Sequence, residues 1–323
     1  MAIKLSCAFA TSLATPEHTR IAEQLGYTRA WYYDSPVLYP DIWVQLCRAA
    51  ELTSTIGLAT GVLVPHLRHP MVNAAAIATL VEAAGQDRVT IGIGTGFTAS
   101  VAMGQRPLTW KYVSNYVRVL KALLRGEETE WDGGVIKMLH WPGYGAKRPI
   151  DVPFVYAAGG PKGFAIAEAE ADGVLAVFSA VPGFDWCVSL ILGTVLDKGE
   201  SAGSARALDA AGHGGAVFFH YAVEHDMLDM VKAGEEWLRS YEALPARTRH
   251  LVMHDGHLVG VNAHDKPYVT GTLLADNGIA LDRAAWRDRV QALTEQGMTE
   301  LAFQPAGSDI PRELEAFAEM VNG

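Results

Sequence analysis

Short apolar runs alternate with longer stretches of helical periodicity along nearly the whole chain, and this alternation limits the possible folds more than any other feature. Such alternation is typical of βαβ units, whose strands pair in parallel. The runs are apolar throughout, as expected of strands covered on both faces. We expect strands at residues 3–10, 30–33, 56–62, 89–93, 154–157, 174–178, 216–223 and 300–303.

Helical patterns follow these runs. Gly26 is placed to end the first helix, and Asp309 to cap the last one, with Pro311 in its first turn. A further helix is expected after the sixth strand, a hairpin or loop over residues 130–148, and no clear register between residues 199 and 278. The remaining helices are expected at 16–25, 41–52, 71–84, 110–125, 162–171 and 282–296 and from 311 onward.

Eight strand–helix units predict a (β/α)8 barrel of the TIM type rather than an open sheet. We see neither a long linker nor an internal repeat, so residues 1–323 are expected to form one domain with insertion segments. Half of the residues are hydrophobic and 19% are charged, which suffices for a large buried core.

Charge and composition argue against several partners. The net charge of −10 comes from scattered carboxylates without a basic run, so nucleic acid is not expected. No apolar stretch is long enough for a membrane span, and the N-terminus lacks a charged-then-apolar leader, so we expect a cytosolic protein. Cys7, Cys47 and Cys187 are too far apart for a disulfide framework and are expected to be small buried hydrophobic residues.

The helix around residues 73–84 is small and apolar on nearly all sides. An outer helix of a barrel normally keeps one polar side for water. We therefore expect a second copy of the chain to cover it, giving a homodimer or higher homo-oligomer; cover by one of the chain's own loops is the alternative.

Reacting groups in barrel enzymes lie just beyond the C-terminal ends of the strands. After the fifth strand, Gly159 and Gly160 begin a helix, where backbone N–H groups and the helix dipole favour an anion, and Lys162 adds a cation. We interpret this turn as a phosphate site, with a plain tight turn as the alternative. The segment 92–96 fits a dinucleotide fingerprint poorly, and a flat ring against this strand end is the better interpretation.

Five stretches occur in the order, and at the strand ends, of a known family. The sequence resembles the luciferase-like flavin- and deazaflavin-dependent oxidoreductases, particularly the branch that includes methylenetetrahydromethanopterin reductases. The stretches are Trp31-Tyr32-Tyr33-Asp34, Thr60-Gly61-Val62, Arg88-Val89-Thr90-Ile91-Gly92-Ile93-Gly94-Thr95-Gly96, Ala157-Ala158-Gly159-Gly160-Pro161-Lys162, and Pro305-Ala306-Gly307 with Asp309-Ile310-Pro311.

The resemblance implies coenzyme F420, a deazaflavin, or alternatively FMN as cofactor. It implies a cis peptide between Gly61 and Val62, a hydrogen bond between Asp34 and the ring, and a phosphate held by the turn after the fifth strand. The implied cofactor-binding residues are Asp34, Thr60, Gly61, Val62, Gly94, Thr95, Gly96, Ala158, Gly159, Gly160, Pro161, Lys162 and Ser179.

Two positions depart from deazaflavin-dependent sugar-phosphate dehydrogenases. Ser35 stands where that group has histidine, and Phe97 where it has glutamate, which argues against sugar-phosphate oxidation. The candidate catalytic residues besides Asp34 are Tyr33 and His66, with His140 as another possible proton donor. The expected substrate pocket holds Ser35, Phe97, Trp110, His140 and Trp141, with Trp131 nearby.

Four histidines near the C-terminus invite a metal interpretation, but their spacing is not that of a helical zinc motif, so we expect no metal. They are His250, His254, His257 and His264. The leading hypothesis is F420-dependent hydride transfer to or from a small organic molecule. An FMN-dependent monooxygenase, a non-catalytic flavin-binding protein and an unrelated barrel enzyme remain alternatives.

Overall fold

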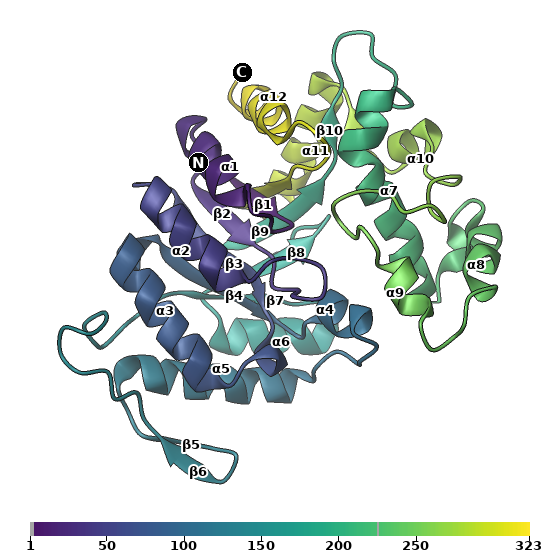
Figure 1. Cartoon of the computed structure of the whole chain (residues 1–323). Coiled ribbons are helices and arrows are strands. Elements are labelled where there is room, and N and C mark those ends of the chain that lie inside the picture. The colour runs from purple at the N-terminus through teal and green to yellow at the C-terminus, as the bar shows by residue number, and fades with distance from the viewer. Residues whose placement is uncertain (1–2, 225) are drawn as a thin grey trace.

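The computed structural model describes residues 3–224 and 226–323. Its centre is a closed barrel of eight parallel strands in the order β1-β12-β9-β8-β7-β4-β3-β2 (Figure 1). The (β/α)8 TIM-barrel prediction is therefore confirmed. The barrel strands are β1 (Lys4–Phe9), β2 (Arg29–Tyr32), β3 (Gly57–Leu63), β4 (Val89–Gly94), β7 (Phe154–Ala157), β8 (Gly173–Val177), β9 (Cys187–Leu192) and β12 (Glu300–Gln304).

An outer layer of helices covers the barrel (Figure 1). Aspartate side chains cap several of them, and Asp309 accepts the Arg312 N–H at the start of the last helix, which confirms the predicted cap. Gly26 follows the first helix with φ +85°, as predicted for a residue that ends a helix. The outer helices are α1 (Thr15–Gln24), α2 (Ile42–Leu52), α3 (Pro70–Ala84), α5 (Trp110–Arg125), α6 (Gly160–Glu170), α11 (Arg283–Glu295) and α12 (Ile310–Asn322).

Two predicted elements are wrong. Residues 216–223 belong to a helix, α7 (Ala205–Glu224), and the seventh barrel strand is β9. A short apolar run bounded by turns looks alike in a buried strand and a buried helix, so periodicity could not separate the two. The helix expected after the sixth strand is also wrong, because the described residues 178–186 between β8 and β9 contain no helix.

Residues 193–282 leave the barrel and form a helical insertion at one end of it (Figure 1). Its first and last segments pair in parallel, with Thr194 opposite Ala280. The insertion has two small apolar cores of its own, and its α9 contacts α4 (Phe97–Ala102) on the barrel. Its elements are β10 (Thr194–Val195), α7, η3 (Leu228–Met230), α8 (Gly234–Glu242), α9 (Arg249–Met253), α10 (Gly271–Asp276) and β11 (Ala280–Leu281).

The stretch at 130–148 contains the predicted hairpin. β5 (Thr129–Trp131) and β6 (Gly134–Ile136) pair antiparallel, and Figure 1 shows them outside the barrel. Two 3-10 turns, η1 (Pro65–Leu67) and η2 (Gln86–Arg88), complete the chain.

Side chains fill the barrel interior. The inner core includes Trp31, with Ala59, Val155 and Val188 around it, so the barrel is a packed core and not a pore. Glu300 is fully buried there; it pairs with Arg29 at 2.5 Å and accepts the Trp31 indole N–H at 3.0 Å. A second, larger core lies between the strands and the outer helices.

Helix α3 packs between α2 and α5, while Val72 on its outer side is 53% exposed. The second subunit expected there stays a prediction. Cys7 and Cys187 are buried, as expected, and Cys47 is half-buried. Among the residues that the structure describes, each helix is too short or too polar to cross a bilayer.

Candidate functional site

The candidate site lies at the mouth of the barrel, which we define as the C-terminal ends of its strands and the loops that follow them. Asp34 follows β2 and is 3% exposed. Its carboxylate accepts the backbone N–H of Val64 at 3.2 Å and both oxygens accept from Arg68 Nη1, at 2.9 and 2.8 Å. The predicted ring-binding aspartate is thus held between two mouth loops.

Arg68 neutralises this buried carboxylate. Burial raises the pKa of Asp34, and the Arg68 guanidinium opposes that rise. A second amino group of Arg68 binds Asp41 at 2.9 Å, so one arginine joins the loop after β2 to the start of α2. Because a guanidinium stays charged, Asp34 is retained at the mouth as a paired carboxylate.

Tyr33 is buried beside Asp34 and donates its hydroxyl hydrogen to Gln304 Oε1 at 2.9 Å. Gln304 ends β12 and donates in turn to the carbonyl of Leu258, at 2.7 Å. Tyr39 donates to the carbonyl of His257 at 2.5 Å. The insertion is therefore hydrogen-bonded to the mouth, and burial keeps the pKa of Tyr33 well above its usual range.

The ends of β3 and β4 form the floor of the site. The Thr60 hydroxyl donates to the Gly92 carbonyl at 2.7 Å, so this predicted cofactor residue is occupied in joining the two strands. The peptide between Gly61 and Val62 is cis, as the resemblance implied. These two residues and Thr95 are partly exposed, which leaves the floor accessible from the mouth.

Glycines at β4 are required by packing. A Cβ on Gly94 would lie 3.1 Å from Val62 Cγ2, and one on Gly96, which has φ +69°, would lie 2.3 Å from Val64 Cγ1. The β3 and β4 loops can approach this closely only because these positions lack side chains.

The turn after β7 is open. Gly159 and Gly160 are exposed at the start of α6, and a Cβ added to either would meet nothing within 4 Å. Ala158 is buried, whereas Pro161 and Lys162 are exposed. Free backbone N–H groups, a helix N-terminus and a nearby lysine make this turn suited to an anion.

The other mouth residues differ in accessibility. His66 in η1 is half-buried, and burial lowers its pKa. Ser35 is buried, Phe97 is 38% exposed, and Ser179 is exposed. A cleft of about 510 Å³ lies beside Ser179 on the flank of the barrel; it is lined by Phe164, Glu168 and residues 179–184.

Comparison with known proteins assigns the family. Residues 13–186, more than half of the chain, match the family described as luciferase-like monooxygenase. The chain belongs to this family. Among curated relatives, this luciferase-like chain is 33% identical to a 5,10-methylenetetrahydromethanopterin reductase of Methanolobus tindarius over 186 residues, which is 55% of the chain and 54% of that relative. The corresponding protein of Archaeoglobus fulgidus is 30% identical over 49% of the chain and 47% of its own length. The matches thus span about half of these relatives.

Solved structures extend the similarity of fold over the whole luciferase-like chain. The coenzyme F420 dependent tetrahydromethanopterin reductase from Methanopyrus kandleri superposes with a TM-score of 0.67 at 19% identity, covering 99% of this chain and 98% of that one. An F420-dependent secondary alcohol dehydrogenase, in complex with an F420–acetone adduct, gives 0.66 at 16% identity over both full chains. The oxygenating constituent of 3,6-diketocamphane monooxygenase from Pseudomonas putida, in complex with FMN, gives 0.64 at 14% identity, covering 99% and 98%.

The luciferase-like barrel separates three of the expected pocket residues. Trp110 stacks on Tyr156 with 6.1 Å between the ring centroids, in the layer between strands and helices. His140 and Trp141 follow the hairpin, where Arg148 donates to the His140 carbonyl and lies beside Gly126, at the C-terminal end of α5. Because α5 begins at the mouth and runs away from it, its first residue Trp110 lies near the mouth, beside Gly163 of α6, and stays a predicted pocket residue. The substrate-pocket predictions for His140 and Trp141 are corrected, since both lie near the far end of α5.

Sequence reasoning missed Arg68 and Gln304. Arg68 lies two residues after the candidate His66, and Gln304 directly precedes the stretch Pro305-Ala306-Gly307. A buried aspartate requires a cation or several donors, and this rule was the available signal for Arg68. Gln304 had no such signal, because its role depends on Tyr33 and Leu258 meeting it in space.

Proposed function

We propose that the chain is a coenzyme F420-dependent oxidoreductase, which transfers hydride between the deazaflavin and a small organic substrate with a C=C, C=N or carbonyl group. The open start of α6 at the barrel mouth carries the proposal, since it offers unobstructed backbone N–H groups to an anionic arm. The F420-dependent reductase and alcohol dehydrogenase that share this fold support F420 as the cofactor.

The residues at the mouth fit such a cofactor. Gly159, Gly160 and Lys162 would hold its phosphate, because no side chain fills the space above the two glycines. The partly exposed surface of Gly61, Val62 and Thr95 would support the flat ring. When bound, the deazaflavin supplies the hydride-transferring carbon, while the protein positions it.

The chain's own groups have separate tasks. Arg68 holds Asp34 as a carboxylate, so this residue accepts hydrogen bonds and does not deliver a proton at neutral pH. Tyr33 is held by Gln304, and the insertion behind it limits the entry of water. His66 is the group that we assign to proton exchange with a substrate, and both of its ring nitrogens are buried without a hydrogen-bond partner.

An FMN-dependent monooxygenase is the second candidate. A solved structure with this fold holds FMN, which favours this candidate. FMN also carries a phosphate, so the α6 turn suits either cofactor. A non-catalytic flavin-binding protein is the third, because Ser35 and Phe97 replace the histidine and glutamate of related dehydrogenases.

Titration of the purified protein with F420 and with FMN, followed by fluorescence, tests the cofactor. We expect F420 to bind more tightly and reduced F420 to be consumed under anaerobic conditions with an acceptor substrate. Oxygen-dependent turnover with reduced FMN would replace the proposal by the second candidate. F420 binding without turnover of any acceptor would favour the third.

A matched pair of variants tests the phosphate site. Gly159 has an extended backbone (φ −136°) and precedes α6, so Asp or Asn fits there and both can cap the helix. Gly159→Asp places a negative charge at the phosphate and should weaken F420 binding about 10-fold or more relative to Gly159→Asn, on the order of 1.4 kcal/mol. Equal affinities for the two variants would remove this turn from the site.

We also propose that the chain is one domain and acts in the cytosol. We further propose that it self-associates through the outer side of α3. Val72 and Thr79 are exposed there. Sedimentation of the wild type against Val72→Glu tests the contact, since a charge in a dimer interface should shift the protein toward monomer. An unchanged oligomeric state would contradict it.

A further inference from the structure

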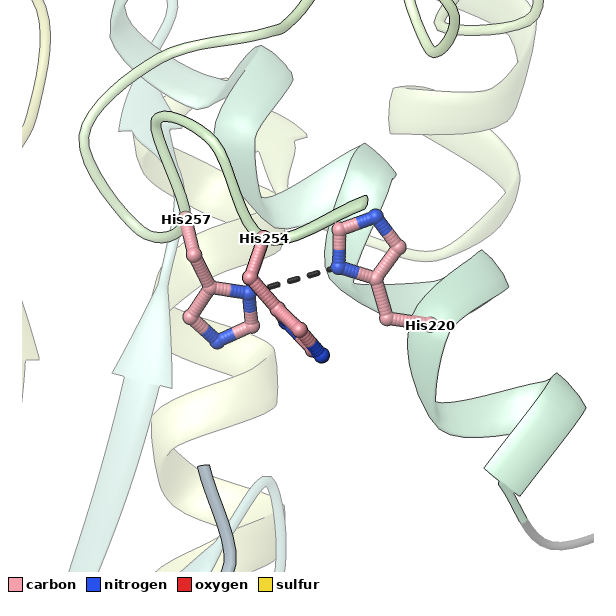
Figure 2. A group of neighbouring side chains, drawn as sticks. All are labelled: His220, His254 and His257. Atoms are coloured by element: carbon pink, nitrogen blue, oxygen red, sulfur yellow. Dashed lines mark hydrogen bonds between the residues drawn. The ribbon is translucent and has the colours of Figure 1, made fainter. Parts of the chain in front are cut away.

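Three histidines of the insertion converge at a buried point outside the proposed cofactor site. His220 lies on α7, and His254 and His257 lie on the segment after α9, which we name the histidine loop (residues 254–265) (Figure 2). One ring nitrogen from each histidine lies within 4.8 Å of those of the other two, and all three residues are buried. Three converging imidazoles are the donor set of many transition-metal sites.

The spacing agrees with a metal centre. Nδ1 of His220 and Nδ1 of His257 are 3.3 Å apart. A tetrahedral zinc ion with Zn–N bonds of about 2.0–2.1 Å holds two nitrogen ligands roughly 3.3–3.4 Å apart. The three ring centroids form a nearly equilateral triangle, with separations of 5.5, 5.5 and 5.3 Å. Small ring rotations would therefore direct one nitrogen of each ring at a shared ion.

Asp265 supplies the outer partner that metal-binding histidines usually have. Its Oδ2 lies 3.2 Å from Nε2 of His220, which leaves Nδ1 of that ring for the ion. The same carboxylate accepts from Trp237 Nε1 at 2.7 Å and from Tyr241 at 2.8 Å. Asn262 donates to it at 2.9 Å. These donors fix the carboxylate, and through it the orientation and tautomer of His220.

The environment of His254 is a second, independent observation that points to a bound ion. His254 is 3% exposed, and both of its ring nitrogens are buried without a hydrogen-bond partner. A buried polar group without a partner destabilises the fold, and a bound ion would remove that cost.

We propose that His220, His254 and His257 bind a divalent transition-metal ion, with zinc the best match to three imidazole ligands. Glu224, at the end of α7, has Oε1 3.8 Å from Nε2 of His254 and offers a carboxylate for a fourth position. Two of the four histidines considered in the sequence, His250 and His264, are not in the group. The partner of the other two comes from α7, more than 30 residues earlier.

The ion would have a structural role that reaches the barrel mouth. It would tie the histidine loop to α7, and this loop accepts hydrogen bonds from Tyr39 and Gln304 through the carbonyls of His257 and Leu258. Ion binding would thus fix the loop that covers Tyr33. The site contains none of the residues assigned to the cofactor, so it can be tested without F420.

Calorimetric titration of chelator-treated full-length protein with ZnCl2 tests the proposal. We expect one equivalent per chain, bound with micromolar affinity or tighter, and a rise in Tm on binding. Cobalt(II) bound in place of zinc should show the visible absorption of a tetrahedral site. Absence of saturable binding by the wild type would overturn the proposal.

Single-residue variants test which side chains bind the ion. His254→Ala removes a ligand without removing a hydrogen bond, so it should fold and should weaken zinc binding more than about 100-fold. Asp265→Asn should weaken it about 10–100-fold through loss of the outer partner. His250→Ala is the matched control, since this neighbouring histidine is not in the group, and its affinity should equal that of the wild type. Stoichiometric zinc binding retained by His254→Ala would overturn the assignment.

Discussion

The mouth of the barrel and the helical insertion each contain a buried aspartate, and the two aspartates are satisfied differently. Asp34 at the mouth pairs with a guanidinium, whereas Asp265 in the insertion accepts from an indole, a phenol and an amide and contacts the His220 ring. At the mouth, the charge of the arginine balances that of the aspartate. In the insertion, neutral hydrogen-bond donors stabilise the aspartate.

This difference reflects what surrounds each carboxylate. The mouth stays accessible, with residues of its floor partly exposed, so an arginine can keep part of its hydration while it binds Asp34. The insertion has only small apolar cores, and a largely buried hydrogen-bond network around Asp265 joins α7 to α8. The barrel therefore depends on hydrophobic packing, and the insertion depends on polar partners that must all be present.

The largest effect should come from Asp265→Ala. It removes the acceptor for Trp237 and Tyr241, leaves their donors buried, and should lower the free energy of unfolding by about 3–5 kcal/mol. Urea denaturation measures it. The control Asp276→Ala, at an exposed position on α10, should change stability by less than about 0.5 kcal/mol. A similarly small loss for Asp265→Ala would mean that the network does not hold the insertion together.

Arg68→Met should lower the free energy of unfolding somewhat less, by about 2–4 kcal/mol at pH 7, because Asp34 would stay buried without its cation. Burial alone then raises the pKa of Asp34. The folded variant therefore takes up a proton that the unfolded chain does not, and the loss should shrink as the pH falls. Denaturation of wild type and variant at several pH values measures this. Arg20→Met, which breaks an exposed pair with Glu17, should have almost no effect.

A smaller effect concerns the pH at which each region begins to lose stability. Burial lowers the pKa of His213 on α7 to about 4, so this ring costs stability as the pH falls from about 6.5, where the unfolded ring protonates, to about 4. The full loss is on the order of 3 kcal/mol, but only part of it is reached at pH 5.

His213→Leu should remove this acid sensitivity while keeping the position apolar, and denaturation from pH 7 to 4.5 measures the change. On the barrel, Glu23 is partly buried, but N–H donors of residues 54–56 lower its pKa to about 2, so its stabilisation is lost only below pH 4.5. The stability contribution of His213 in the insertion should thus be lost at milder acidity than that of Glu23 on the barrel. Parallel pH profiles for wild type and His213→Leu would contradict this.

The barrel could be predicted because its signals are local. Apolar runs, helix caps such as Asp309 and the glycine at position 26 each act within a few residues, and they placed seven of the eight strands. The strand expected at residues 216–223 failed where the signals conflict, since this segment is rich in β-branched and aromatic residues yet continues α7. In that helix tertiary burial outweighs intrinsic preference.

The candidate site, like the barrel, has parts that could be predicted from the sequence and parts that could not. The glycine turn at 159–160 and the positions of Asp34 and Thr95 after their strands follow from the barrel rule and the family resemblance. The mistaken placement of His140 and Trp141 arose because a hairpin between two elements can lie at either end of a barrel. Only its contacts near Gly126 decided which end.

The sequence alone determined a parallel barrel, its family and the strand ends at which chemistry is expected, because periodicity, capping and turn geometry depend on near neighbours in the chain. Only the tertiary structure decided that Arg68 neutralises Asp34 and that His220 meets His254 and His257. Those pairings join residues some 34 or more positions apart, and no local pattern specifies which distant groups will share a buried, weakly solvated environment.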